Sequence, residues 1–98
     1  MISDHNSSVE SRSDAVLSLA RAAGQTRQFR IAQPHVSIRM AERGVTMKCI
    51  SRALQTATEA THQPERDRWK LTGGVDVDGA ELILIVKVDR GVLVVTVF

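Results

Sequence analysis

The strongest constraint on the fold lies in residues 69–98, where apolar residues alternate with polar ones around two turn sequences. Asp78-Gly79 is a dipeptide typical of a two-residue hairpin turn, and Arg90-Gly91 marks a second turn. Together they predict three antiparallel strands that share one continuous apolar face. The expected pairs are Trp69 with Val88, Leu71 with Val86, Gly73 with Leu84, Val75 with Leu82, Val88 with Leu93, Val86 with Val95, and Leu84 with Val97.

The same register predicts what stands on the opposite face of this sheet. It places Lys70 beside Lys87, with Arg68 at the same end and the hydroxyl of Thr96 in the neighbouring row. Like charges side by side repel, so an anion such as phosphate would be favoured there. The alternative is that the lysine stems extend into solvent across an apolar sheet face.

Apolar residues on this second face raise a separate question. Ile83, Ile85, Val94 and Phe98 need a cover, which is either a helix of the same chain or a partner. The final strand has no charged gatekeeper and would be an exposed edge if nothing paired with it. We therefore expect a protein partner or a homodimer.

Three helices are expected before the sheet. The first runs from the N-cap residue Ser13 to Gly24 and follows a flexible, polar lead-in over residues 1–12. The third begins at Thr46, whose hydroxyl can cap it. The apolar face of the first helix comprises Val16, Leu19, Ala20 and Ala23, and that of the third comprises Met47, Ile50, Leu54 and Ala57.

Two connections complete the expected α+β domain over residues 13–98. Residues 25–31 form either a short strand or an extended connector, and residues 61–67, which include Pro64, form a loop. The expected architecture is N-terminal helices packed on a C-terminal three- to four-stranded antiparallel sheet. A chain of 98 residues suits one such domain.

The second helix carries the most pronounced pattern of charge. Pro34 suits its first turn and Gly44 its left-handed end, while His35, Arg39 and Arg43 recur every fourth residue on one face. In one interpretation, acidic residues neutralise the arginines. In the other, the arginines hold a phosphate and the imidazole moves a proton near neutral pH.

Composition restricts the compartment and the chemistry. A single cysteine, Cys49, excludes an internal disulfide and fits a reduced cytoplasmic setting, and a catalytic role for it has no evident support. The N-terminus does not resemble a secretory signal, and no apolar run reaches the length of a membrane span. The three histidines show no metal-ligand spacing, so we expect neither a metal nor another cofactor.

Residues 34–98 combine the helix His35, Arg39, Arg43, Gly44 with a C-terminal Val94-Val95-Thr96-Val97 segment. In these motifs the chain resembles a bacterial family of small domains of unknown function, akin to the RelE-like ribonuclease toxins and the wider group of barnase, EndoU and colicin nucleases. The resemblance implies helices before a twisted antiparallel sheet, metal-independent endoribonuclease activity, and neutralisation by a cognate antitoxin.

Within this resemblance, His35, Arg39, Arg43 and Thr96 occupy the family-pattern positions and are the expected catalytic residues. Lys70, Lys87 and Arg68 are the expected RNA-phosphate ligands, inferred from strand register. The expected function is that of the toxin of a bacterial toxin–antitoxin system that cleaves RNA by attack of its own 2′-hydroxyl. The rival interpretation is a non-catalytic module that binds nucleic acid or protein. This chain has no tyrosine, unlike several toxins of the wider group.

Overall fold

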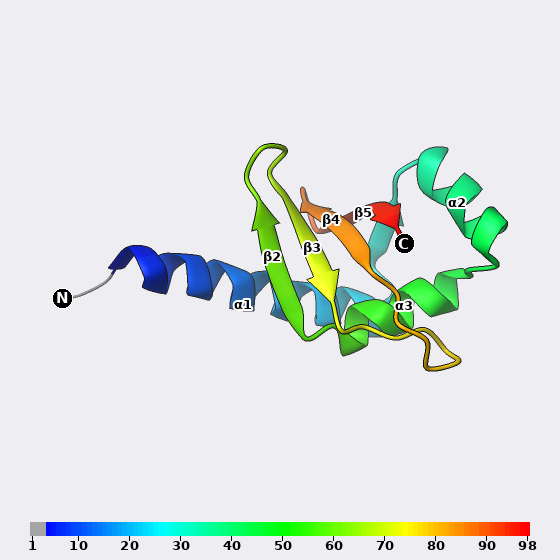
Figure 1. The fold of residues 1–98 in the computed structure, drawn as a ribbon, viewed down its shortest axis with the longest axis horizontal. Helices are drawn as coiled ribbons and strands as arrows, with labels where there is room; N and C mark the ends of the chain where they lie inside the picture. The colour runs from blue at the N-terminus through cyan, green and yellow to red at the C-terminus, as the bar shows by residue number, and fades with distance from the viewer. Residues whose placement is uncertain (1–3) are drawn as a thin grey trace.

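The fold of the chain is α+β, as expected, in a computed structural model that describes the backbone of residues 4–98 and the side chains of residues 12–98. Residues 4–98 form three helices and five strands, and the strands make one mixed sheet in the order β1-β5-β4-β3-β2 (Figure 1). Only β1 runs parallel to its neighbour. The elements are α1 (Asp4–Thr26), β1 (Phe29–Ile31), α2 (His35–Arg43), α3 (Met47–Thr56), β2 (Glu59–Gln63), β3 (Arg68–Thr72), β4 (Leu84–Val88) and β5 (Val92–Val97).

The prediction of a three- to four-stranded antiparallel sheet is therefore wrong in two respects. The sheet gains β1, which pairs in parallel with β5 and confirms the strand alternative for Phe29–Ile31, whereas residues 25–26 belong to α1. It also gains β2, which pairs with β3 where a loop was expected. Because β1 covers the outer side of β5, the C-terminal strand is not an edge, and that argument for a partner no longer holds.

The hairpin between β2 and β3 shows that the loop prediction for residues 61–67 is wrong for residues 61–63, which belong to β2, and correct for residues 64–67, which form the turn. Pro64 does not interrupt a strand but follows the last residue of β2, and the Arg66 N–H donates to the Gln63 carbonyl at 3.3 Å. Pro at the second position of such a turn is favourable. The His62 Nε2 atom lies 3.0 Å from the Asp67 Oδ1 atom. Asp67 has a positive φ of 51°, a conformation that aspartate tolerates.

The register of β3 with β4 is displaced by two residues from the predicted one, because Leu71 faces Leu84 rather than Val86. The turn is wider than Asp78-Gly79: a loop closes between Asp76 and Ala80, whose backbone groups bond at 2.8 Å. The Asp76 carboxylate accepts two further backbone N–H groups, at 2.9 and 3.0 Å. A two-residue shift leaves every side chain on its predicted face.

The register of β4 with β5 is confirmed at one end only. Leu84 faces Val97 as predicted, but a bulge between Ile85 and Val86 then pairs Val86 with Val94 instead of Val95. The bulge directs Val94 into the core, where it is fully buried, rather than onto the second face.

Helices α1 and α3 pack on one face of the sheet and form the core with it (Figure 1). Helix α1 begins at Asp4 and not at Ser13, so it includes much of the predicted lead-in; residues 1–3 lie outside the described residues. Gly24 lies within α1 and does not end it. The predicted apolar faces are buried except for Leu19 and Met47, which are 38% and 46% exposed.

The predicted helix ends are correct for α2 and α3. Gly44 ends α2 with a left-handed φ of 68°, and the Thr46 hydroxyl accepts the Cys49 N–H at 3.3 Å to cap α3. Val36 is fully buried and anchors α2, which packs against β5. Within residues 4–98, none of the helices has both the length and the apolar character needed to cross a membrane.

Candidate RNA-binding site

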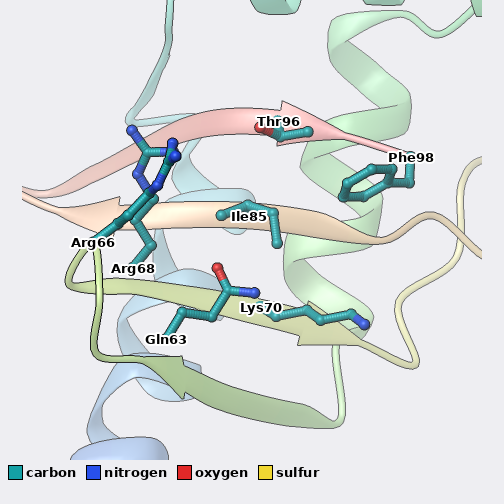
Figure 2. A pocket seen from close by; sticks show the side chains of 7 residues that line it. All are labelled: Gln63, Arg66, Arg68, Lys70, Ile85, Thr96 and Phe98. Carbon is teal, nitrogen blue, oxygen red and sulfur yellow. The ribbon is translucent and has the colours of Figure 1, made fainter.

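A hollow of about 320 Å³ lies on the sheet face opposite α1 and α3 (Figure 2). Four neighbouring strands position its walls, and the turn between β2 and β3 closes one side. The hollow is lined by Gln63, Arg66, Arg68, Lys70, Ile85, Thr96 and Phe98. We call it the sheet-face hollow.

Strand pairing places three side chains next to one another at the centre of the sheet-face hollow. Lys70 faces Ile85 across β3 and β4, and Ile85 faces Thr96 across β4 and β5. Ile85 is only 7% exposed although it lies outside the main core cluster, so it forms an apolar floor between the polar side chains. One helix-free face thus combines a buried apolar residue with a lysine and a hydroxyl.

The structure divides the predicted lysine cluster. Arg68, Lys70 and Thr96 all line the sheet-face hollow, but Lys87 does not, because it faces Leu93 and is exposed. The predicted pairing of Lys70 with Lys87 is wrong, since it depended on the two-residue turn.

Four lining residues were not predicted as site residues: Ile85 and Phe98 were expected on this face only as apolar residues in need of a cover, and Gln63 and Arg66 were missed entirely. The latter two belong to the hairpin that was interpreted as a loop, at the end of β2 and in the turn. Proline at the second position of a Gln-Pro-Glu-Arg turn is the sequence feature that could have indicated the hairpin. Once β2 is paired with β3, Gln63 faces Arg68, which brings the turn to the edge of the hollow.

The sheet-face hollow is strongly cationic. Arg66, Arg68 and Lys70 line it, and none of its seven described lining residues is acidic. Among the side chains of residues 12–98, these three form no salt bridge and no hydrogen bond, whereas His62 and Asp67 nearby are paired at 3.0 Å. Unneutralised like charges at one place favour binding of an anion.

The cationic groups lie at two opposite ends of the sheet-face hollow. Figure 2 shows the side chains of Arg66 and Arg68 extending toward the same end of the hollow, while the Phe98 ring lies at the other end with the Lys70 ammonium below it. The Thr96 hydroxyl donates to the Val95 carbonyl at 2.7 Å. Its oxygen therefore remains free to accept a hydrogen bond, for example from a ribose hydroxyl.

The stripe on α2 does not line the sheet-face hollow. His35 and Arg43 are exposed, whereas Arg39 is half-buried and its Nε atom is buried without a hydrogen-bond partner among the described residues. Figure 1 shows α2 beside the end of the sheet that carries the C-terminus. The predicted site thus separates into a helix stripe and a sheet-face hollow, with Thr96 alone of the family-pattern residues in the hollow.

Two titratable groups outside the hollow have shifted pKa values. Hydrogen bonds from the side chain and backbone of Thr46 lower the pKa of the buried Cys49 thiol. The hydrogen bond to His62 lowers the pKa of Asp67. Among the residues that the structure describes, no group of three or more His, Cys, Asp or Glu side chains is placed to share a metal ion.

The chemistry available in the sheet-face hollow is that of anion binding. Arginine offers planar sets of donors that match phosphate oxygens, and lysine adds a compact positive charge. The described lining residues include no histidine, carboxylate, thiol or phenol, so proton transfer by such a group would require a residue from elsewhere, such as His35. Comparison of the chain with protein-family models, curated proteins and solved structures found no match to any of them.

Proposed function

We propose that this protein binds RNA through the sheet-face hollow and cleaves it as a metal-independent endoribonuclease, the toxin of a bacterial toxin–antitoxin system. The observation that carries the proposal is the set of three cations, Arg66, Arg68 and Lys70, in a hollow whose described lining residues include no acidic one. The two guanidinium groups at one end suit a phosphodiester and the added negative charge of its transition state, and the Lys70 ammonium at the other end suits a neighbouring phosphate of the same strand.

In the proposed reaction, the 2′-oxygen of a ribose forms a bond to the adjacent phosphorus, and the bond from phosphorus to the 5′-oxygen breaks. A base takes the proton of the 2′-hydroxyl, and an acid gives a proton to the departing 5′-oxygen. The products are a 2′,3′-cyclic phosphate and a free 5′-hydroxyl. His35 is the candidate acid or base, since it is exposed on α2 and an imidazole is the side chain that most often moves protons in catalysis.

The test is incubation of purified protein with a mixed RNA pool in EDTA, followed by sequencing of the cut ends and analysis for 2′,3′-cyclic phosphates. Lys70→Ala should reduce cleavage strongly, whereas Lys87→Ala should leave it nearly unchanged because Lys87 is exposed outside the hollow. His35→Ala should abolish cleavage in a folded protein. Equal cleavage by the Lys70 and Lys87 variants would exclude the hollow as the site.

A non-catalytic nucleic-acid-binding module is the second candidate, and one observation favours it. The described lining residues include no histidine, carboxylate, thiol or phenol that could serve as acid or base, and His35 is not among them. Intact RNA in the EDTA assay, together with salt-sensitive RNA binding that weakens in Lys70→Ala, would support this candidate over the nuclease.

The toxin proposal also requires a cytoplasmic setting and a cognate antitoxin. The antitoxin would be expected to cover the sheet-face hollow, since covering these cations prevents RNA from binding. Expression of the chain alone should therefore arrest bacterial growth, and His35→Ala should relieve the arrest. Normal growth with a well-expressed, folded protein would contradict the toxin proposal.

A further inference from the structure

The sheet-face hollow has a second, apolar component that phosphate binding does not use. The Phe98 ring lies at the end opposite Arg66 and Arg68, and Ile85 forms the floor between them (Figure 2). Phe98 is 44% exposed, whereas Ile85 is 7% exposed. An accessible aromatic ring beside an apolar floor suits a flat, apolar ligand surface in addition to an anion.

The main chain of Phe98 is hydrogen-bonded to Ile83. The Phe98 N–H donates to the Ile83 carbonyl at 2.8 Å, and the Ile83 N–H donates to the Phe98 carbonyl at 3.4 Å. These two bonds continue the pairing of β4 with β5 beyond Val97. Because both bonds join its main chain to Ile83, Phe98 presents its ring from a paired position that continues the sheet.

The size of the hollow restricts how much of a ligand it can hold. Its volume, about 320 Å³, lies at the lower limit of small-molecule pockets, which span about 300–1,000 Å³. Phe98 is the only aromatic residue among the seven described lining residues. A run of stacked bases needs a series of rings, so one ring and this volume suit a single base.

We infer that the sheet-face hollow holds one unpaired nucleotide of a single-stranded RNA, with its phosphate at Arg66 and Arg68 and its base against Phe98 and Ile85. The inference rests on the proposed function and adds the substrate class. A paired base is stacked on both faces inside a duplex and cannot offer a face to Phe98, whereas an unpaired base can. Gln63 and Thr96 then lie beside the nucleotide as hydrogen-bonding side chains.

The test measures binding of a short, labelled 2′-O-methyl RNA by fluorescence anisotropy, because this RNA lacks the attacking hydroxyl and cannot be cleaved by the proposed reaction. The single strand is compared with the same strand annealed to its complement. Phe98→Ala should weaken binding of the single strand by about 5- to 150-fold, the fold-change that corresponds to loss of one stacked base. Its effect on the duplex should be small.

Matched variants separate this inference from the proposed function. Phe98→Leu retains apolar contact without a ring and should bind nearly as weakly as Phe98→Ala, while Lys87→Ala should bind like the wild type. One outcome that contradicts the nucleotide inference is that Arg68→Ala weakens binding while Phe98→Ala does not. Another is that the wild type binds duplex and single strand equally. In both cases RNA binding by the hollow would still stand. If Arg68→Ala has no effect either, the proposed function is also wrong. Circular dichroism confirms that each variant is folded.

Discussion

Helices α1 and α3 cross at Gly24. For the substitution Gly24→Ala, the close contact at this crossing predicts a loss of stability, whereas helix propensity alone predicts a gain. In Gly24→Ala, the added Cβ would lie 2.6 Å from the Ser51 carbonyl oxygen and 2.9 Å from atoms of Leu54 and Gln55. Propensity alone favours alanine over glycine in a helix by about 1 kcal/mol. Overpacking typically costs about 1–3 kcal/mol, and here the closest atom belongs to the backbone, which cannot rotate away.

A second contribution comes from the hydrogen bond at the same crossing. The buried Ser51 hydroxyl donates to the Gly24 carbonyl at 2.6 Å, and separation of the helices would weaken this bond, whose net worth is about 1 kcal/mol. The expected net effect of Gly24→Ala is therefore a loss of about 1–3 kcal/mol in the free energy of unfolding. With a urea dependence of about 1–3 kcal/mol/M, the midpoint should fall by roughly 1 M.

Urea denaturation followed by circular dichroism measures this change. Ala22→Gly is the control, because Ala22 is exposed on the same helix and should lose only about 1 kcal/mol through propensity. Ser51→Ala tests the hydrogen bond without the steric clash and should cost about 1 kcal/mol or somewhat more. A Gly24→Ala protein as stable as the wild type, or more stable, would refute the close approach of the two helices.

Three further predictions concern charge and capping. Lys70→Ala should reduce the slope of log Kobs against log salt for single-stranded RNA by about 0.7, the value for one lost phosphate contact, and an unchanged slope would exclude that contact. The hydrogen bond from His62 lowers the pKa of Asp67, so this bond stabilises the fold above the unfolded pKa of Asp67 and ceases to do so as pH falls through the folded pKa. Urea denaturation should therefore show the wild type to be more stable than Asp67→Asn at neutral pH, and the difference in stability should disappear in acid. Thr46→Ala should cost about 1 kcal/mol and raise the pKa of Cys49 in an ultraviolet thiolate titration, whereas Thr46→Ser should retain both properties.

Helix limits that depend on local chemistry could be predicted from the sequence. Gly44 and Thr46 were assigned correctly because a left-handed C-cap and an N-cap hydroxyl act within one turn of the chain. Gly24 was misassigned because the same residue type also serves close helix contact, and sequence gives no sign of α3 lying against it. A glycine's role depends on what approaches it.

Strand pairing could be predicted only in part, because it depends on turns and on distant partners. The pairing of β1 with β5 joins segments far apart in the chain, and no local pattern indicates which edge a three-residue strand will choose. The Asp76 carboxylate widened the first turn by accepting two backbone N–H groups, which the Asp78-Gly79 motif does not reveal. Alternation nevertheless gave the correct face for most residues, since a two-residue shift preserves it.

The candidate site is more sensitive to register than the core is. A shift of two residues moves a side chain by about 7 Å along its strand, which is immaterial to a continuous apolar face but decides which charged groups meet. It separates Lys70 from Lys87 and places Lys70 in the row of Ile85 and Thr96. The phosphate ligands of the proposed site therefore come from β3 and its hairpin and not from two facing lysines.

The same geometry defines what a nuclease mechanism requires of this fold. The sheet-face hollow supplies cations but no described proton-transfer group, whereas His35 lies on α2, which packs against β5. Thr96 belongs to β5 and lines the hollow, so β5 is the element that connects the two predicted groups. RNA bound in the hollow must extend across β5 toward α2 for His35 to act. His35→Ala would then abolish cleavage while leaving binding of a 2′-O-methyl RNA almost unchanged, and this separation distinguishes a nuclease from a binding module.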